Sequence, residues 1–298
     1  MELKIEHRAI QTNGVELHTV YAGPENGNIV VLLHGFPEYW RGFRRQIEYL
    51  AGAGFRVIVP DQRGYNLSGK PGKISDYDID LLAGDIVGII DSLPKQKICL
   101  VGHDWGGVVA WWIALKFPDR LKNLTVLNAP HPVVMSRALK ASWSQILKSW
   151  YVVFFQIPFV PEWLARCGNF AFLVRSLKGS SRRGTFSDED MAHYREAWRR
   201  PGALRSMIHW YRASLKKSME TVEKTRIGIP TLVIWGEQDT FLGKELAAKS
   251  AALCERARIT FLPEATHWLQ HEEPDKVNAL LRDFLKDDSP EEYLAEKS

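Results

Sequence analysis

The chain has 298 residues, of which 45% are hydrophobic and 25% charged, a composition ordinary for a globular protein with a sizeable core. Its 39 basic and 35 acidic residues give a net charge of +4, which is too even and too scattered to predict a nucleic-acid partner. The odd number and wide separation of the three cysteines, Cys99, Cys167 and Cys254, argue against a disulfide framework, and their spacing is not that of metal ligands. No segment approaches the ~20 apolar residues of a membrane span, and residues 1–11 lack an apolar signal segment, so we expect a cytoplasmic protein.

Six short apolar segments, each followed by turn residues, are typical of strands buried on both faces of a parallel sheet. They are residues 29–33, 56–59, 97–101, 124–127, 231–235 and 258–262. Helical patterns lie between them, for example at 77–93, 106–117 and 274–286, and residues 4–12 and 16–21 are expected to pair as an edge hairpin. This alternation predicts an α/β fold with a mostly parallel central sheet and helices on both faces.

The alternation stops between residues 131 and 220, where the sequence is helical in pattern and dense in aromatic residues. A helical block inserted between two strands of one sheet is best interpreted as a cap over the carboxyl edge of the sheet, where open α/β sheets place ligands. We therefore expect residues 1–130 and 221–298 to form the core domain and residues 131–220 the helical cap.

A junction between a strand and a helix gives the first catalytic signal. Residues 102–107 read Gly-His-Asp-Trp-Gly-Gly, which matches the nucleophile elbow Gly-x-Ser-x-Gly except that Asp104 replaces the serine. The elbow exposes its central side chain above the sheet, and the flanking glycines let neighbouring backbones pass closely. The alternative is a glycine-rich loop in which Asp104 merely caps the following helix.

The segment His34-Gly35-Phe36-Pro37 directly follows the strand at 29–33. In hydrolases with such an elbow, this loop and the residue after the nucleophile supply the oxyanion hole. We expect the backbone N–H groups of Phe36 and Trp105 to do so here, with Pro37 as a candidate cis proline that fixes the loop. The side chain of His34 is expected to be buried and to brace the loop.

Two more polar residues follow strand ends in the order expected of a triad. Asp239 comes after the strand at 231–235, and His267 comes after the strand at 258–262. Taken alone, an aspartate in a turn is usually a turn former. Together with Asp104 at the same edge of the sheet, Asp239 and His267 predict a catalytic triad.

The motifs at residues 34–38, 61–65, 102–107 and 236–239 resemble those of the α/β-hydrolase-fold epoxide hydrolases of the soluble type, and the resemblance covers about residues 29–284. It implies that Tyr151 and Tyr211 are the family's two cap tyrosines, whose hydroxyls hold the epoxide oxygen. The alternative for either tyrosine is an amphipathic core aromatic. The expected lining of the substrate pocket consists of Pro37, Phe155 and Trp268.

The chemistry follows from the nucleophile. Asp104 is ionised at neutral pH, with an ordinary pKa of about 3.9, so it can displace a leaving group at an sp³ carbon without a base. The resulting alkoxide needs a proton, which Tyr151 and Tyr211 can give because a phenol has a pKa of about 10. His267, held by Asp239, would then activate water to hydrolyse the ester on Asp104. The expected reaction converts a hydrophobic epoxide and water to a vicinal diol, with no metal or organic cofactor.

Three other functions stay open at this point. A haloalkane or haloacid dehalogenase uses the same aspartate, but it would need halide-binding N–H donors, for which only Trp105 is obvious. A carboxylesterase is disfavoured because no serine occupies the elbow. A non-catalytic ligand receptor on this fold would normally have lost part of the triad. The sequence does not give the physiological substrate, its chain length, the enantio- and regioselectivity or the oligomeric state.

Overall fold

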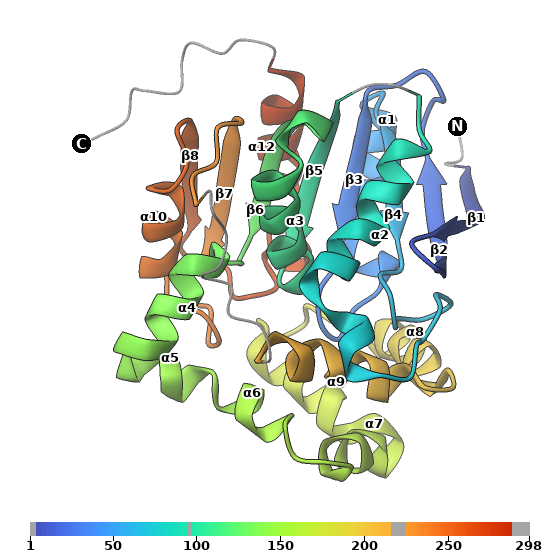
Figure 1. Ribbon diagram of the computed structural model, residues 1–298, viewed down its shortest axis with the longest axis vertical. Coiled ribbons are helices and arrows are strands. Elements are labelled where there is room, and N and C mark those ends of the chain that lie inside the picture. The colour runs from blue at the N-terminus through green and yellow to red at the C-terminus, as the bar shows by residue number, and fades with distance from the viewer. Residues whose placement is uncertain (1–3, 95–96, 216–224, 288–298) are drawn as a thin grey trace.

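The computed structural model describes residues 4–94, 97–215 and 225–287. Eight strands form one sheet in the order β1-β2-β4-β3-β5-β6-β7-β8 (Figure 1). The pairings β1–β2 and β2–β4 are antiparallel, and all the later pairings are parallel, which confirms the predicted mostly parallel sheet with a hairpin at one edge. The strands are β1 (Ile5–Thr12), β2 (Val15–Ala22), β3 (Ile29–Leu33), β4 (Arg56–Pro60), β5 (Ile98–His103), β6 (Leu121–Leu127), β7 (Thr231–Gly236) and β8 (Ala257–Leu262).

The ends of the predicted strands lie within three residues of the observed ends, and the two main differences concern β6 and β8. β6 begins at Leu121, three residues before the predicted start, because the polar Lys122 and Asn123 interrupt the apolar run without interrupting the strand. β8 was expected to be buried on both faces, and this is wrong: Ile259 and Phe261 are 36% and 37% exposed. The reason is that β8 is the last strand of the sheet and pairs only with β7.

Alternate side chains of the central strands enter two separate hydrophobic layers, as a strand periodicity of two requires. In β3, Val31 and Leu33 pack in the layer under α2 and α3, whereas Val30 and Leu32 pack in the layer under α1 and α12. The helices that accompany the sheet are α1 (Arg44–Gly52), α2 (Ile79–Asp91), α3 (Trp105–Lys116), α10 (Glu245–Ala251), α11 (Leu269–Glu272) and α12 (Pro274–Lys286), with 3-10 turns at Trp40–Phe43, Ile74–Tyr77 and Pro118–Arg120.

Between β6 and β7 the chain forms a separate group of helices, which Figure 1 shows at one end of the molecule, beyond one end of the strands. These are α4 (Pro132–Ala141), α5 (Trp143–Lys148), α6 (Trp150–Phe154), α7 (Val160–Ser180), α8 (Asp188–Arg199) and α9 (Ala203–Ser214). The first boundary expected for the cap, at residues 130 and 131, falls just before α4. The second, at residues 220 and 221, lies outside the described residues.

These helices are packed onto the core by apolar and polar contacts. Trp198 of α8 and Trp210 of α9 lie in the same hydrophobic cluster as the strand residues under α2 and α3. Their indole N–H groups donate hydrogen bonds of 2.7 Å to the carbonyl oxygen of Pro37 and 3.0 Å to that of Arg63. The helical group therefore rests directly on the loops that follow β3 and β4. Within the described ranges, no helix is both long and apolar enough to cross a bilayer.

Candidate active site

Asp104 lies at the sharp turn between β5 and α3, with φ of +51° and ψ of −123°. This is a strained conformation for a residue other than glycine. A side chain at Gly106 would collide with the carbonyl oxygen of Leu33, so glycine is required for α3 to start this close to β3. The carboxylate of Asp104 makes no capping hydrogen bond to α3. Asp104 occupies the N-cap position of α3, but its side chain does not cap the helix, so the alternative interpretation of this side chain as a mere cap is wrong.

The loop after β3 contacts the elbow directly. The backbone N–H of Phe36 donates a hydrogen bond of 2.8 Å to Oδ1 of Asp104, and the Phe36–Pro37 peptide bond is cis, as expected. Trp105 is the first residue of α3, so its backbone N–H lies at the helix N-terminus, where N–H groups lack intrahelical partners. His34 is fully buried and its Nε2 accepts a 3.0 Å hydrogen bond from the backbone N–H of Gln62, which confirms its bracing role.

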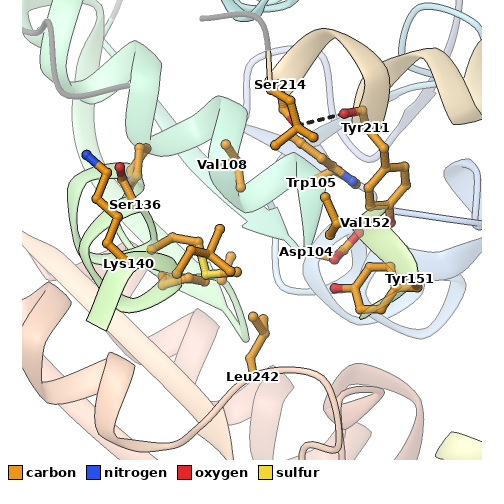
Figure 2. A pocket seen from close by; sticks show the side chains of 16 residues that line it. Asp104, Trp105, Val108, Ser136, Lys140, Tyr151, Val152, Tyr211, Ser214 and Leu242 are labelled. Atoms are coloured by element: carbon orange, nitrogen blue, oxygen red, sulfur yellow. Dashed lines mark hydrogen bonds between the residues drawn. The ribbon is translucent and has the colours of Figure 1, made fainter. Parts of the chain in front are cut away.

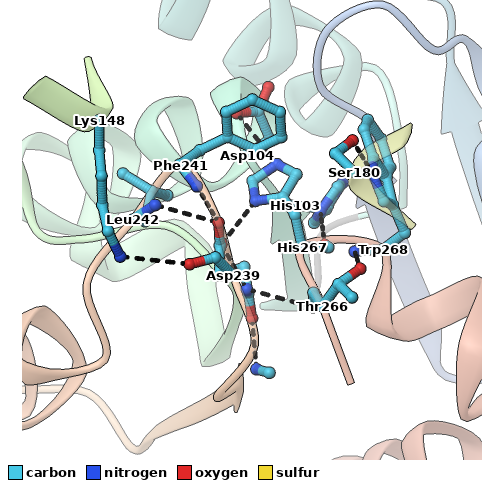
Figure 3. Close-up of polar contacts among 12 residues, drawn as sticks. His103, Asp104, Lys148, Ser180, Asp239, Phe241, Leu242, Thr266, His267 and Trp268 are labelled. Atoms are coloured by element: carbon cyan, nitrogen blue, oxygen red, sulfur yellow. Dashed lines mark hydrogen bonds and ion pairs between the residues drawn. The ribbon is translucent and has the colours of Figure 1, made fainter. Parts of the chain in front are cut away.

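His267 lies between two carboxylates (Figure 3). Its Nε2 is 3.5 Å from Oδ2 of Asp104, and its Nδ1 is 2.7 Å from Oδ2 of Asp239. Burial by itself disfavours the imidazolium, but the charge of Asp239 and the hydrogen bonds to both carboxylates outweigh it and raise the pKa of His267 to about 10. The Nδ1 proton therefore points at Asp239, and Nε2 points at Asp104.

The charge of Asp104 is retained in spite of its burial. Desolvation raises the pKa of this carboxyl group, but hydrogen bonding to His267, the charges of His267 and His103, and the N–H of Phe36 together lower it below the ordinary value. The side chain is thus an ionised carboxylate at neutral pH and available as a nucleophile.

Asp239 is held by three N–H donors besides His267. The backbone N–H groups of Phe241 and Leu242 donate to Oδ1 at 2.7 and 3.0 Å, and Asn128 Nδ2 donates to Oδ2 at 2.6 Å. Asn128 in turn accepts a 2.7 Å hydrogen bond from the backbone N–H of Gly236. Asn128 is a functional residue that was not predicted from the sequence, although its place directly after an apolar strand is the same signal that identified Asp239 and His267.

A cluster of buried polar side chains lies next to the triad. Nε2 of His103 is 2.9 Å from the carbonyl oxygen of His267, and its Nδ1 is 3.1 Å from the side-chain amide of Gln270. Glu38 is 2.7 Å from His271 and accepts a hydrogen bond of 2.5 Å from the hydroxyl of Tyr194 on α8. Burial raises the pKa of Glu38, but the charge of His271 and hydrogen bonds to the two histidines bring it well below the ordinary value. This cluster fixes the backbone at His267 and connects it to α8.

Tyr151 of α6 and Tyr211 of α9 come from the helical group and lie beside Asp104 (Figure 2). Their rings pack edge to face, with centroids 5.8 Å apart. Burial, followed by the charge of Asp104, raises the pKa of both phenols far above the ordinary value. Both side chains are therefore proton donors throughout the neutral range.

Two cavities of very different size meet at Asp104. The larger has a volume of about 490 Å³ and extends between α3, α4 and α9, with mostly apolar walls that include Val108, Met135, Leu139 and Leu242 (Figure 2). The smaller has a volume of about 70 Å³ and is lined by the three expected pocket residues Pro37, Phe155 and Trp268, together with His267. Tyr151 and Tyr211 line both cavities. The walls contributed by α3 and α4 were not predicted from the sequence, because apolar helix residues that face a cavity have the same pattern as core residues.

The arrangement agrees with what comparison of the chain with known proteins finds. Residues 28–274 match the family described as alpha/beta hydrolase fold. The chain therefore belongs to the α/β-hydrolase family. The resemblance to its epoxide hydrolase members is confirmed by relatives of both known sequence and known structure.

Among the curated relatives, the AB hydrolase superfamily protein YfhM of Bacillus subtilis is 44% identical over 277 residues, which cover 93% of this chain and 96% of that protein. Epoxide hydrolase 4 of Homo sapiens is 37% identical over 286 residues, covering 94% of this chain and 78% of the relative. Among solved structures, a Bacillus megaterium epoxide hydrolase in complex with an inhibitor superimposes with a TM-score of 0.86 at 32% identity, covering 94% of this chain and all of that one.

Proposed function

We propose that this protein is an epoxide hydrolase that converts hydrophobic epoxides to vicinal diols through a covalent ester on Asp104. The observation that carries the proposal is the position of one ionised carboxylate between two protonated phenols and a carboxylate-bound histidine. A halide leaves as a stable anion and needs no proton, whereas an epoxide oxygen leaves as a strong base and needs one. Two buried phenols beside the nucleophile therefore favour the epoxide over the haloalkane.

In the first half of the reaction, a carboxylate oxygen of Asp104 attacks an epoxide carbon, and the bond from that carbon to the ring oxygen breaks. The ring oxygen takes a proton from Tyr151 or Tyr211, so the products are a hydroxyalkyl ester and a phenolate. No base is needed, because Asp104 is already ionised.

In the second half, the imidazolium of His267 gives its proton to the phenolate, and the neutral imidazole then takes a proton from a water molecule that attacks the carbonyl carbon of the ester. The N–H groups of Phe36 and Trp105 are the proposed donors to the tetrahedral oxyanion. When the intermediate collapses, the diol oxygen receives the proton from His267, and the remaining water proton passes to His267 and restores the imidazolium of the resting enzyme. The sum is one epoxide and one water consumed for each diol, and the oxygen of the water remains in Asp104.

The helical group fits the role of the cap that we expected for residues 131–220. It supplies both tyrosines and part of the walls of both cavities, while the triad comes from the strand ends of the core. The apolar walls suit a hydrophobic substrate. Within the part of the chain that the structure describes, Cys99, Cys167 and Cys254 form no disulfide, which supports the proposal that the protein works in the reducing cytoplasm.

The test replaces His267 with glutamine, which leaves Asp104 able to attack but removes the base for the second half. After mixing with styrene oxide, intact-mass spectrometry should show an adduct equal in mass to the whole epoxide, because ring opening loses no atoms. The matched control is the double variant Asp104→Asn, His267→Gln, which should form no adduct.

A parallel sample with a haloalkane separates the two aspartate chemistries. An adduct with the haloalkane and none with the epoxide would establish a dehalogenase and reject the proposal. Slow diol formation by His267→Gln without any adduct would show that water attacks the epoxide directly, and the ester on Asp104 would be wrong.

A further inference from the structure

The outer side of the helical group carries an unusual amount of exposed apolar surface. Along α5, α6 and the start of α7, six large side chains are between 57% and 84% exposed. We call them the outer aromatic face: Trp143, Leu147, Trp150, Val153, Phe159 and Trp163. Scattered single apolar residues are normal on a protein surface, but a cluster of this size within 21 residues marks a site of interaction. Figure 1 shows these helices at the end of the molecule away from the sheet.

The same part of the chain is strongly basic. Residues 131–183 contain eight lysines and arginines and a single acidic residue, Glu162, whereas the whole chain has a net charge of only +4. Glu162 is paired with Arg212 at 2.5 Å, and two of the eight cations are also paired, Lys178 with Asp188 at 2.7 Å and Arg182 with Glu273 at 2.8 Å. The positive charge near the exposed aromatics therefore rests on the other basic residues. Arg137 and Arg166 are exposed, and Arg166 lies one helical turn from Trp163.

Exposed tryptophans combined with basic residues match the chemistry of an anionic membrane surface. Tryptophan partitions into the headgroup region of bilayers, and each lysine or arginine near an anionic surface adds attraction. A second copy of this chain fits less well. A two-fold dimer places the same patch opposite itself, so two basic faces would be brought together.

We propose that the outer aromatic face docks on the surface of an anionic lipid bilayer, with its aromatic side chains in the headgroup region. The helix α6 connects this face to the active site. Val153 is 70% exposed, while Tyr151 and Val152, on the same five-residue helix, line the larger cavity; Trp150 is 57% exposed and also borders the smaller cavity. Docking in this orientation places the cap, and with it the wall of the cavity, next to the lipid phase in which hydrophobic epoxides dissolve.

The test is flotation of the purified protein with vesicles of equimolar phosphatidylglycerol and phosphatidylcholine, and with vesicles of phosphatidylcholine alone. The protein should float with the anionic vesicles, and high salt should reduce the bound fraction. In the triple variant Trp143→Ser, Phe159→Ser, Trp163→Ser, binding to the anionic vesicles should fall by about tenfold or more. The double variant Arg137→Glu, Arg166→Glu should lose its preference for the anionic vesicles, with a fall in binding of about tenfold.

Matched controls remove similar groups elsewhere on the surface. Leu81 and Phe117 are 36% and 38% exposed on α2 and at the end of α3, and their double replacement by serine should leave vesicle binding unchanged. The same is expected when the exposed Lys97 and Lys249 are both replaced by glutamate. Circular dichroism and epoxide turnover in vesicle-free buffer check that every variant is folded, so lipid docking is tested separately from the proposed reaction.

Two outcomes would overturn the docking proposal. The first is equal vesicle binding by the wild-type protein and the triple variant. The second is no vesicle binding at all together with a concentration-dependent dimer that the triple variant abolishes, which would make this face an interface between two copies of the chain.

Discussion

Replacement of Asp104 by asparagine should shift the titration of His267 by several pH units. The substitution removes one negative charge 3.5 Å from Nε2 of His267 and preserves the shape of the side chain. At that distance, and with an effective dielectric constant of about 20, a unit charge contributes about 5 kcal/mol, which corresponds to roughly three pKa units. The pKa of His267 should therefore fall from about 10 to roughly 7.

Asparagine also imitates the ester, which carries no charge, so the same fall should occur when Asp104 is alkylated. In the resting enzyme, His267 is an imidazolium that cannot accept a proton. Formation of the ester would bring its pKa near neutrality and convert it to a base at the stage when water has to be activated. The loss of the charge on Asp104 would thus by itself ensure that His267 acts as a base only after the ester has formed.

The assay is an NMR titration of protein labelled with nitrogen-15 in its nine histidines, with His267 assigned by its absence from the spectrum of His267→Gln. The control is Asn128→Asp, which keeps Asp104 intact and adds a carboxyl group on the side of Asp239. The pKa of His267 in Asn128→Asp should be no lower than in the wild type. If the pKa of His267 in Asp104→Asn differed from that in the wild type by less than one unit, this would falsify the electrostatic coupling between Asp104 and His267.

Further predictions concern turnover, stability and selectivity. Tyr151→Phe and Tyr211→Phe should each slow ester formation by roughly tenfold to a hundredfold, and the double variant should be almost inactive in a stopped-flow assay; wild-type rates would rule out both phenols as donors. Asn128→Ala leaves the buried carboxylate of Asp239 without one donor, and should lower the free energy of unfolding in urea by roughly 1–3 kcal/mol. Because folding raises the pKa of His267, the protonated residue stabilises the wild type fully below pH 6.5, and this contribution should be lost as the pH rises through about 10. Thermal melts between pH 6.5 and about 10 should show a smaller loss of stability for Asp104→Asn than for the wild type. The inequality of the two cavities, about 490 and about 70 Å³, predicts faster diol formation from an aryl-substituted terminal epoxide than from a trans epoxide with two aryl groups, and equal rates would contradict it.

The sequence predicts the sheet and the triad because both leave short-range signals. Apolar runs that end in polar residues mark the strands, and the carboxyl ends of parallel strands share one edge, so Asp104, Asp239 and His267 had to lie near each other. The residues 102–107 specify the elbow because few other sequences permit so tight a passage of two backbones.

What the sequence could not provide depends on long-range packing. The distance from His267 to Asp104, the sizes of the cavities and the direction in which the side chains of α4 point are set by contacts between segments far apart in the chain. The sequence also did not reveal the two faces of α6, because the cavity-lining Tyr151 and the exposed Val153 lie in a run of apolar residues without a distinguishing period. The exposure of β8 likewise depends on its place at the end of the sheet, which the composition of the strand does not reveal.

The hydrophobic cluster that joins the sheet to α8 and α9 bears on how the molecule unfolds. Trp198 and Trp210 are buried in the same apolar layer as the strands, and Tyr194 is bonded to Glu38 in the core. Melting of the helical group alone would expose that layer and leave the carboxylate of Glu38 without one of its donors. The helices and the sheet should therefore lose structure in a single cooperative calorimetric transition, and hydrogen exchange in α8 and α9 should proceed through global unfolding.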